Sequence, residues 1–168
     1  MPTGPAARAL IDTVAHPLPP NLLPGPGSPN VLIGFAPAWR GIPLAAVTAL
    51  QTAKAIADTA IKAAEAATMA AAGTPGASAA YAAEQATKSA ALASMSSAIA
   101  SAAASGADIH NCSTPTPVPP HGPGVVITGS ATVLINFLPA ARQGDTILEA
   151  IGPPNTITSG EPTVIIGG

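Results

Sequence analysis

The chain has 168 residues, with six basic against eight acidic side chains and a single cysteine, Cys112. Sparse and balanced charge argues against nucleic-acid binding, which needs clustered Lys and Arg to neutralise phosphates. Twenty Pro, 16 Gly and only four aromatic residues leave little large apolar surface for a core. We therefore expect a further stabilising device, and the lone cysteine excludes an internal disulfide.

The first 42 residues are rich in turn formers. Met1 to Pro5 contains no basic segment followed by an apolar run, so we expect no cleavable secretion signal. Eight Pro and Gly residues between Pro17 and Pro29 exclude a helix. The run Val31-Leu32-Ile33 that follows predicts a strand of about four or five residues.

Residues 43–106 are dominated by Ala. Pro43 suits a first helical turn, and 73–76, Gly-Thr-Pro-Gly, form a turn with helix breakers on both sides. We predict two antiparallel helices, at 44–72 and 77–105. One polar stripe with neighbouring opposite charges marks the first of them, through Gln51, Lys54, Asp58, Lys62 and Glu65.

This helical segment allows a second interpretation. Residues 89–107 carry no charge over a length that could cross a bilayer, which is compatible with a membrane-seeking or chaperone-covered pair of helices. Ala and Ser are only weakly apolar and the first helix is charged, so we favour a soluble hairpin.

From residue 107 the sequence is again rich in turn-forming residues. Short apolar runs predict strands at 125–127, 132–136, 147–148, 156–158 and 163–166. Two segments of this chain are copies of each other: Gly27–Arg40 and Gly129–Arg142 align without a gap and share nine of 14 residues. A third copy begins at Gly160 and stops at Gly168, and its missing half is found at Gly4–Arg8. A repeat broken across both termini predicts a closed ring of three units, with Gly168 beside Pro5.

The expected fold is therefore mainly β: a small, tapering body with pseudo-threefold symmetry, completed by both termini. The predicted division is a discontinuous body, 1–42 and 107–168, with the helical hairpin 43–106 inserted into one unit.

All His and Cys residues of the chain lie in the predicted β body: His16, His110, Cys112 and His121. His110 and Cys112 are two residues apart, on the same side of an extended chain. Three imidazoles and a thiolate suit the closed tetrahedral site that zinc uses structurally. The competing interpretation is unrelated surface histidines and one buried thiol.

Signals for catalysis are weak. Asp12 follows Arg8 and Asp145 follows Arg142, so each aspartate is interpreted as the partner of its own arginine, fixing a turn. Glu149 and Glu161 stand alone in the sequence, and no nucleophile elbow or phosphate-binding loop is present. We expect no enzymatic activity, although a zinc hydrolase remains an alternative of a different class.

The repeated sequence resembles that of the proline-alanine-alanine-arginine (PAAR) repeat family. The resemblance rests on 139–145, Pro-Ala-Ala-Arg-Gln-Gly-Asp, on Pro5–Arg8, on the degenerate Pro37–Arg40 and on the closing 163–168, Thr-Val-Ile-Ile-Gly-Gly. Ala6-Ala7-Arg8 with Asp12 and His16 is also similar to the N-terminal motif of PAAR effectors. Those effectors read Arg-x-x-Asp, whereas three residues separate Arg8 from Asp12 here.

This resemblance implies a conical domain that caps the trimeric VgrG spike of a type VI secretion system, sharpens it and carries effectors through a target membrane. It implies a structural zinc near the apex, held by His16, His110, Cys112 and His121. It also implies one monomer on each spike trimer, transient contact with the target membrane, an effector or chaperone on the hairpin, and a cytoplasmic protein that the contractile apparatus exports.

We expect the spike to be bound by the ends of the repeated strands, at Val31, Ile33, Val133, Ile135, Val164 and Ile166. The motif itself is expected to be architectural, through Pro5, Arg8, Pro139, Ala140, Ala141, Arg142 and Asp145. Two alternatives stay open: the tip of a phage tail or extracellular contractile injection particle, and the N-terminal fragment of a longer PAAR effector.

Overall fold

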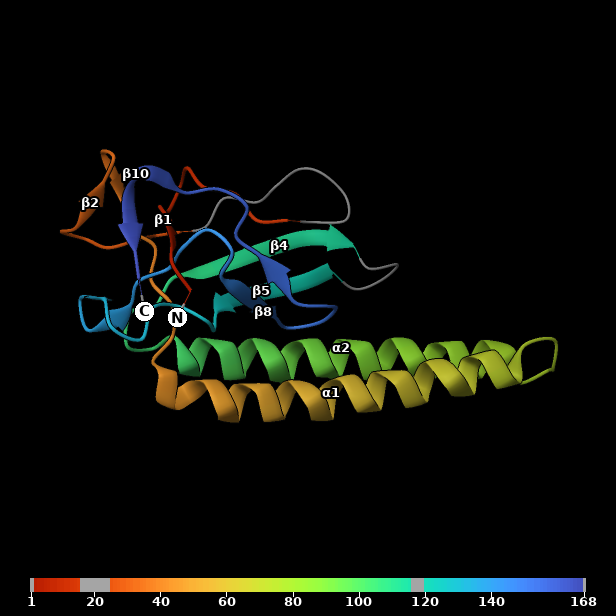
Figure 1. The fold of residues 1–168 in the computed structure, drawn as a ribbon. Helices are drawn as coiled ribbons and strands as arrows, with labels where there is room; N and C mark the ends of the chain where they lie inside the picture. The colour runs from red at the N-terminus through yellow and green to blue at the C-terminus, as the bar shows by residue number, and fades with distance from the viewer. Residues whose placement is uncertain (1, 16–24, 116–119, 168) are drawn as a thin grey trace.

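The computed structural model describes residues 2–15, 25–115 and 120–167, with the side chains of 113–115 left out. Within these ranges the chain forms two long helices and ten short strands (Figure 1). The strands make one four-stranded sheet and three two-stranded units, all of them antiparallel.

The two helices predicted from the Ala-rich segment are confirmed. α1 spans Leu44–Ala71 and α2 spans Ala77–Ala102, so the second helix ends three residues before the expected boundary. Pro43 precedes α1, and Gly73, with φ of +78°, makes the turn between the helices. In the described residues neither helix has the length and apolar character that a membrane crossing requires.

The helical hairpin lies along the strands over part of its length, and its end with the turn between α1 and α2 extends beyond them (Figure 1). One buried cluster joins helix residues such as Leu50, Met95 and Ile99 to Val125 and Leu148 of the sheet. The hairpin and the β body therefore share a core, and each covers apolar surface of the other.

Part of the predicted polar stripe faces inward and fixes the helices to each other. The ammonium of Lys88 on α2 lies 2.7 Å from Glu65 of α1 and 2.6 Å from Glu84 one turn earlier on α2. Lys54 and Asp58 form a second pair, along α1. Burial alone lowers the pKa of Lys88, but the bonds to the two carboxylates outweigh it and raise that pKa.

The four-stranded sheet is formed by residues that follow the helices, between 109 and 156. Its order is β4 (Ile109–Pro115), β5 (Pro120–Val126), β8 (Thr146–Glu149) and β9 (Asn155–Thr156). The three two-stranded units are the repeat copies: β2 (Leu32–Ile33) with β3 (Ala36–Pro37), β6 (Leu134–Ile135) with β7 (Leu138–Pro139), and β1 (Gly4–Ala6) with β10 (Glu161–Ile166).

The third copy is assembled from both ends of the chain, as the broken repeat predicts. Gly4 pairs with Ile166 and Pro5 with Ile165. Gly168, the expected neighbour of Pro5, lies outside the described residues.

Three backbone hydrogen bonds join the copies in a cycle. The amide of Ala7 donates to the carbonyl of Ala141 (2.9 Å), Ala141 donates to Trp39 (2.9 Å), and Trp39 donates back to Ala7 (3.0 Å). These residues hold the same position in the three Pro-Ala-Ala-Arg segments. Around the cycle one apolar cluster gathers equivalent residues of all three copies: Ala6, Ile33, Ala38, Ile135, Ala140 and Ile166.

The expectation of a mainly β chain needs correction. The helices contain 28 and 26 residues, whereas β2, β3, β6 and β7 have two residues each. The repeat strands are this short because the chain turns back at once through two-residue loops, at 34–35 and 136–137. The chain therefore has mixed α and β content.

Candidate metal centre

A row of paired residues crosses β4, β5 and β8. His110 of β4 is opposite Gly124 of β5, and Gly124 is opposite Glu149 of β8. Paired residues of antiparallel strands present their side chains on the same face, and Cys112, two residues after His110, shares that face. His110, Cys112 and Glu149 are all buried, with exposed fractions of 0, 1 and 0%.

Gly124 makes the close approach across β5 possible. A Cβ atom at this position would lie 3.0 Å from Cγ of Glu149, 3.3 Å from Cδ2 of His110 and 2.9 Å from Cγ2 of Ile147. Any side chain at residue 124 would therefore push the imidazole and the carboxylate apart.

The ligand atoms of His110, Cys112 and Glu149 all lie within 4.8 Å of one another. Nε2 of His110 lies 3.0 Å from Oε1 of Glu149. A nitrogen, a sulfur and an oxygen donor on three rigid strands form a group that could hold a metal ion, and zinc accepts all three donor types.

His121 lies on the other side of the same carboxylate. Its Nδ1 is 2.7 Å from Oε2 of Glu149, and its ring is 2% exposed. The left-handed φ of +78° at Gly122 and a register shift after Cys112 interrupt the strand alternation here. His16, the fourth predicted ligand, lies outside the described residues.

The expectation that Glu149 stands alone is wrong. Burial raises the pKa of Glu149, but the hydrogen bonds with His110 and Asn155 and the electrostatic interaction with the two histidines outweigh burial and lower it. One sequence signal could have identified this residue: Glu149 is the only charge in the apolar run Ile147–Ile151, which places a carboxylate inside a core strand.

Comparison with known protein families gives a match over the part of the chain that contains His121, Arg142 and Glu149. Residues 116–168 match the family model described as the PAAR motif. The match covers the C-terminal third of the chain, so this segment carries a PAAR motif. PAAR proteins are structural spike-tip proteins, their known context is the type VI secretion system, and their domains generally bind metal. No curated protein and no solved structure matches this chain.

The arginine of each PAAR copy is fixed by an aspartate. The two predicted pairs are confirmed: Arg8 binds Asp12 at 2.9 Å, and Arg142 binds Asp145 at 3.0 Å. A third pair, Arg40 with Asp108 at 2.9 Å, spans the helical insertion. With 43–106 removed, Asp108 would follow Arg40 at the spacing of Asp12 after Arg8, so the sequence did contain this signal.

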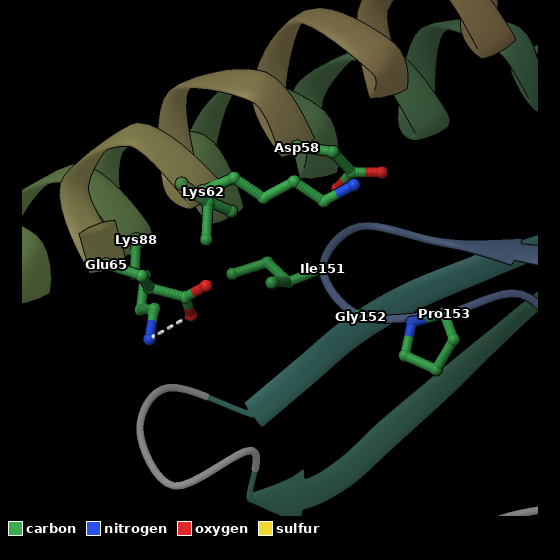
Figure 2. A pocket seen from close by; sticks show the side chains of 8 residues that line it. Asp58, Lys62, Glu65, Lys88, Ile151, Gly152 and Pro153 are labelled. Atoms are coloured by element: carbon green, nitrogen blue, oxygen red, sulfur yellow. Dashed lines mark ion pairs between the residues drawn. The ribbon is translucent and has the colours of Figure 1, made fainter. Parts of the chain in front are cut away.

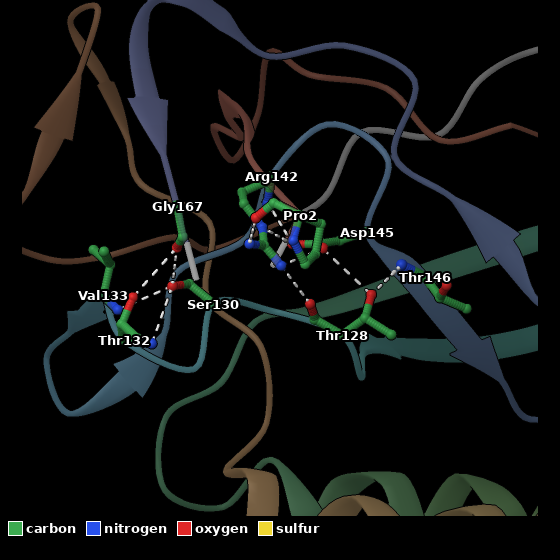
Figure 3. A network of polar contacts seen from close by, with 9 residues as sticks. All are labelled: Pro2, Thr128, Ser130, Thr132, Val133, Arg142, Asp145, Thr146 and Gly167. Atoms are coloured by element: carbon green, nitrogen blue, oxygen red, sulfur yellow. Dashed lines mark hydrogen bonds and ion pairs between the residues drawn. The ribbon is translucent and has the colours of Figure 1, made fainter.

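The guanidinium of Arg142 ties the PAAR turn to the N-terminal segment (Figure 3). It donates to the carbonyl oxygens of Pro2 and Thr128, both at 2.8 Å, in addition to the Asp145 carboxylate. On the left of the view, Ser130 donates to the carbonyl of Gly167. Glu161, also expected to be isolated, accepts a bond of 2.6 Å from Arg8.

The six residues predicted to bind the spike divide into two groups. Ile33, Ile135 and Ile166 are buried in the cluster around the backbone cycle, and Val31 packs against it. Val133 and Val164 are 37 and 38% exposed. The buried isoleucines therefore support this end of the molecule, and a partner would meet their exposed neighbours.

A groove separates α1 from the loop after β8 (Figure 2). Lys62 and Asp58 line one side of it and Ile151 and Pro153 the other. Lys88 also lines the groove and is paired with Glu65, as the dashed line in the figure marks, and with Glu84. The charge of Lys88 therefore belongs to the ion pairs that join the two helices.

Proposed function

We propose that this PAAR protein is a non-enzymatic tip that caps the trimeric VgrG-type spike of a type VI secretion system. In this role it sharpens the spike, helps it to puncture a target membrane and carries effectors. The observation that carries the proposal is the closed backbone cycle that joins the three repeat units, because a trimeric partner presents three equivalent surfaces to which such units can be matched.

The end of the molecule that bears these units also exposes equivalent apolar side chains. Leu32, Leu134 and Ile165 occupy the same position in the three copies and are 64, 55 and 60% exposed. β2 and β10 lie together at this end, opposite the turn between α1 and α2 (Figure 1). This surface is the proposed base of a cone with pseudo-threefold symmetry, built from 1–42 and 107–168.

The spike would extend the strands of this base. Val31, Val133 and Val164 lie beside the exposed residues, and Ile33, Ile135 and Ile166 form the buried floor beneath them. Such β-augmentation takes its affinity from backbone hydrogen bonds and its specificity from alternate side chains.

The metal centre is proposed as a structural zinc site near the apex of the cone. His110, Cys112 and Glu149 would hold the ion, and His121 or His16 would complete a closed set of four ligands. A bound zinc supplies a cross-link between strands, and a closed set leaves no position for a reacting water. The small, aromatic-poor core makes such a cross-link valuable.

The proposed function also implies where the protein is made and how it leaves the cell. We propose that it is made in the cytoplasm, is exported on firing of the contractile apparatus and contacts the target membrane only transiently. The outer face of the helical hairpin would receive an effector or a chaperone.

The test is the stoichiometry of a complex with a VgrG-type trimer, measured by size-exclusion chromatography with light scattering. One chain for each trimer is expected. Leu134→Arg should abolish the complex, whereas Ile56→Arg, at a residue of α1 that is 68% exposed, should leave it intact. Absence of a complex, or three chains for each trimer, would contradict the proposal.

A further inference from the structure

Both phenylalanines of the chain are at the tips of repeat hairpins. Phe35 lies in the loop between β2 and β3, and Phe137 lies in the loop between β6 and β7. They hold the same position in two copies of the repeat, and their exposed fractions are 100 and 94%. An exposed aromatic ring gains nothing from the core of its own chain.

The backbone at these tips makes the two aromatic side chains costly. φ is +53° at Gly34 and +66° at Phe35, and it is +53° at Asn136 and +65° at Phe137. Two consecutive left-handed residues are typical of the tight hairpin turn that favours Asn-Gly, with glycine second. A bulky residue in this region is strained. The same costly choice in two copies points to a partner outside the chain.

The two tips are fixed relative to each other. Oγ of Ser28 donates to Oδ1 of Asn136 at 2.6 Å, and Nδ2 of Asn136 donates to Oδ1 of Asn30 at 2.8 Å. Ser28 and Asn30 belong to the copy that carries Phe35, and Asn136 precedes Phe137. Such preorganisation lowers the entropy cost of binding to a shaped protein surface, whereas insertion into fluid lipid needs no fixed spacing.

The third copy has no aromatic residue at this position. Its strand, β10, ends at Ile166, and the sequence continues there with two glycines, Gly167 and Gly168. The base is therefore threefold in its aliphatic contacts, through Leu32, Leu134 and Ile165, but carries an aromatic ring at two corners.

We propose that Phe35 and Phe137 are a pair of aromatic anchors that enter apolar pockets on two of the three subunits of the spike. This inference rests on the proposed spike-capping function and deepens it. Buried aromatic side chains commonly dominate the affinity of protein interfaces. The partner is a protein surface that presents the same pocket three times, of which two are filled.

The experiment titrates the full chain against a VgrG-type trimer by isothermal calorimetry. Phe35→Gly and Phe137→Gly should each weaken binding at least tenfold, and the double variant at least a hundredfold. Because glycine adopts positive φ without strain, the melting temperature of the free variants should stay equal or rise. Tyr81→Ala, which removes an exposed aromatic ring from α2, is the matched control and should bind like the wild type.

The outcomes separate the two proposals. A wild-type chain that does not bind the trimer overturns the capping function and the anchors with it. A double variant that binds within threefold of the wild type overturns the anchors alone. Sedimentation with phosphatidylglycerol and phosphatidylcholine vesicles is the second arm: binding that only the wild type shows would assign the rings to lipid and overturn the protein pockets.

Discussion

The pair Arg40–Asp108 closes the body across the helical insertion. The Asp108 carboxylate accepts bonds from the amide of Arg40 (2.7 Å), from its Nη2 (2.9 Å) and from the amide of Gly27 (2.8 Å). The side chain of Asp108 is 0% exposed and that of Arg40 is 7% exposed. Asp108→Ala would therefore remove the counter-charge of a buried guanidinium, which keeps only the carbonyl of Gly27, and would leave two backbone amides without this acceptor.

The expected loss is large. Removing one partner of a buried ion pair costs about 3–5 kcal/mol, against a total stability of about 5–15 kcal/mol for ordinary domains. For a chain of this size the melting temperature should fall by roughly 6–20 °C. Urea unfolding followed by circular dichroism measures the free energy, and the helices provide a strong signal.

Two further variants make this test specific. Asp58→Ala removes one partner of the more exposed pair with Lys54 and should cost at most about 1 kcal/mol. Replacing both buried partners, as Arg40→Met with Asp108→Leu, should recover part of the loss because no uncompensated charge remains. An Asp108→Ala variant within about 1 kcal/mol of the wild type would refute the structural role of this pair.

Other predictions concern the metal centre and the helices. The purified chain should contain one zinc by mass spectrometry of the metal, and Cys112→Ala should lose both the zinc and stability. Gly124→Ala should retain less zinc, and its free energy of unfolding should be about 1–3 kcal/mol lower, since the added methyl group meets Glu149. Unchanged zinc content would contradict the arrangement in which Gly124 of β5 lies between His110 of β4 and Glu149 of β8. The hydrogen bond from Lys88 lowers the pKa of Glu84, so this carboxylate stabilises the fold above its ordinary pKa and the contribution disappears on acidification. Glu84→Gln should accordingly be less stable than the wild type at pH 7, and the difference in urea midpoint should shrink as the pH falls below the ordinary pKa of a glutamate; a constant difference would be inconsistent with this pairing.

Elements coded by local sequence were predictable. The helices follow from an Ala-rich composition bounded by Pro43 and by the Gly-Thr-Pro-Gly turn, and their observed bounds differ from the prediction by at most three residues. The pairing of Arg142 with Asp145 follows from a separation of three residues. In both cases the determining contacts lie within a few residues along the chain.

Contacts set by tertiary register were not predictable in the same way. Glu149 reaches His110 only because β5 places Gly124 between their strands, and Asp108 reaches Arg40 only after 43–106 have folded back. Strand alternation likewise indicates that one residue of a pair such as Leu32 and Ile33 is buried, but not which. The structure assigns burial to Ile33 and exposure to Leu32.

Cryo-electron microscopy of the chain bound to a VgrG-type trimer tests the central claim most directly. The account predicts one chain on the spike axis, with Leu32, Leu134 and Ile165 at the interface and His110 and Cys112 at the far side. A complex in which the helical hairpin or the metal centre faces the spike would contradict it.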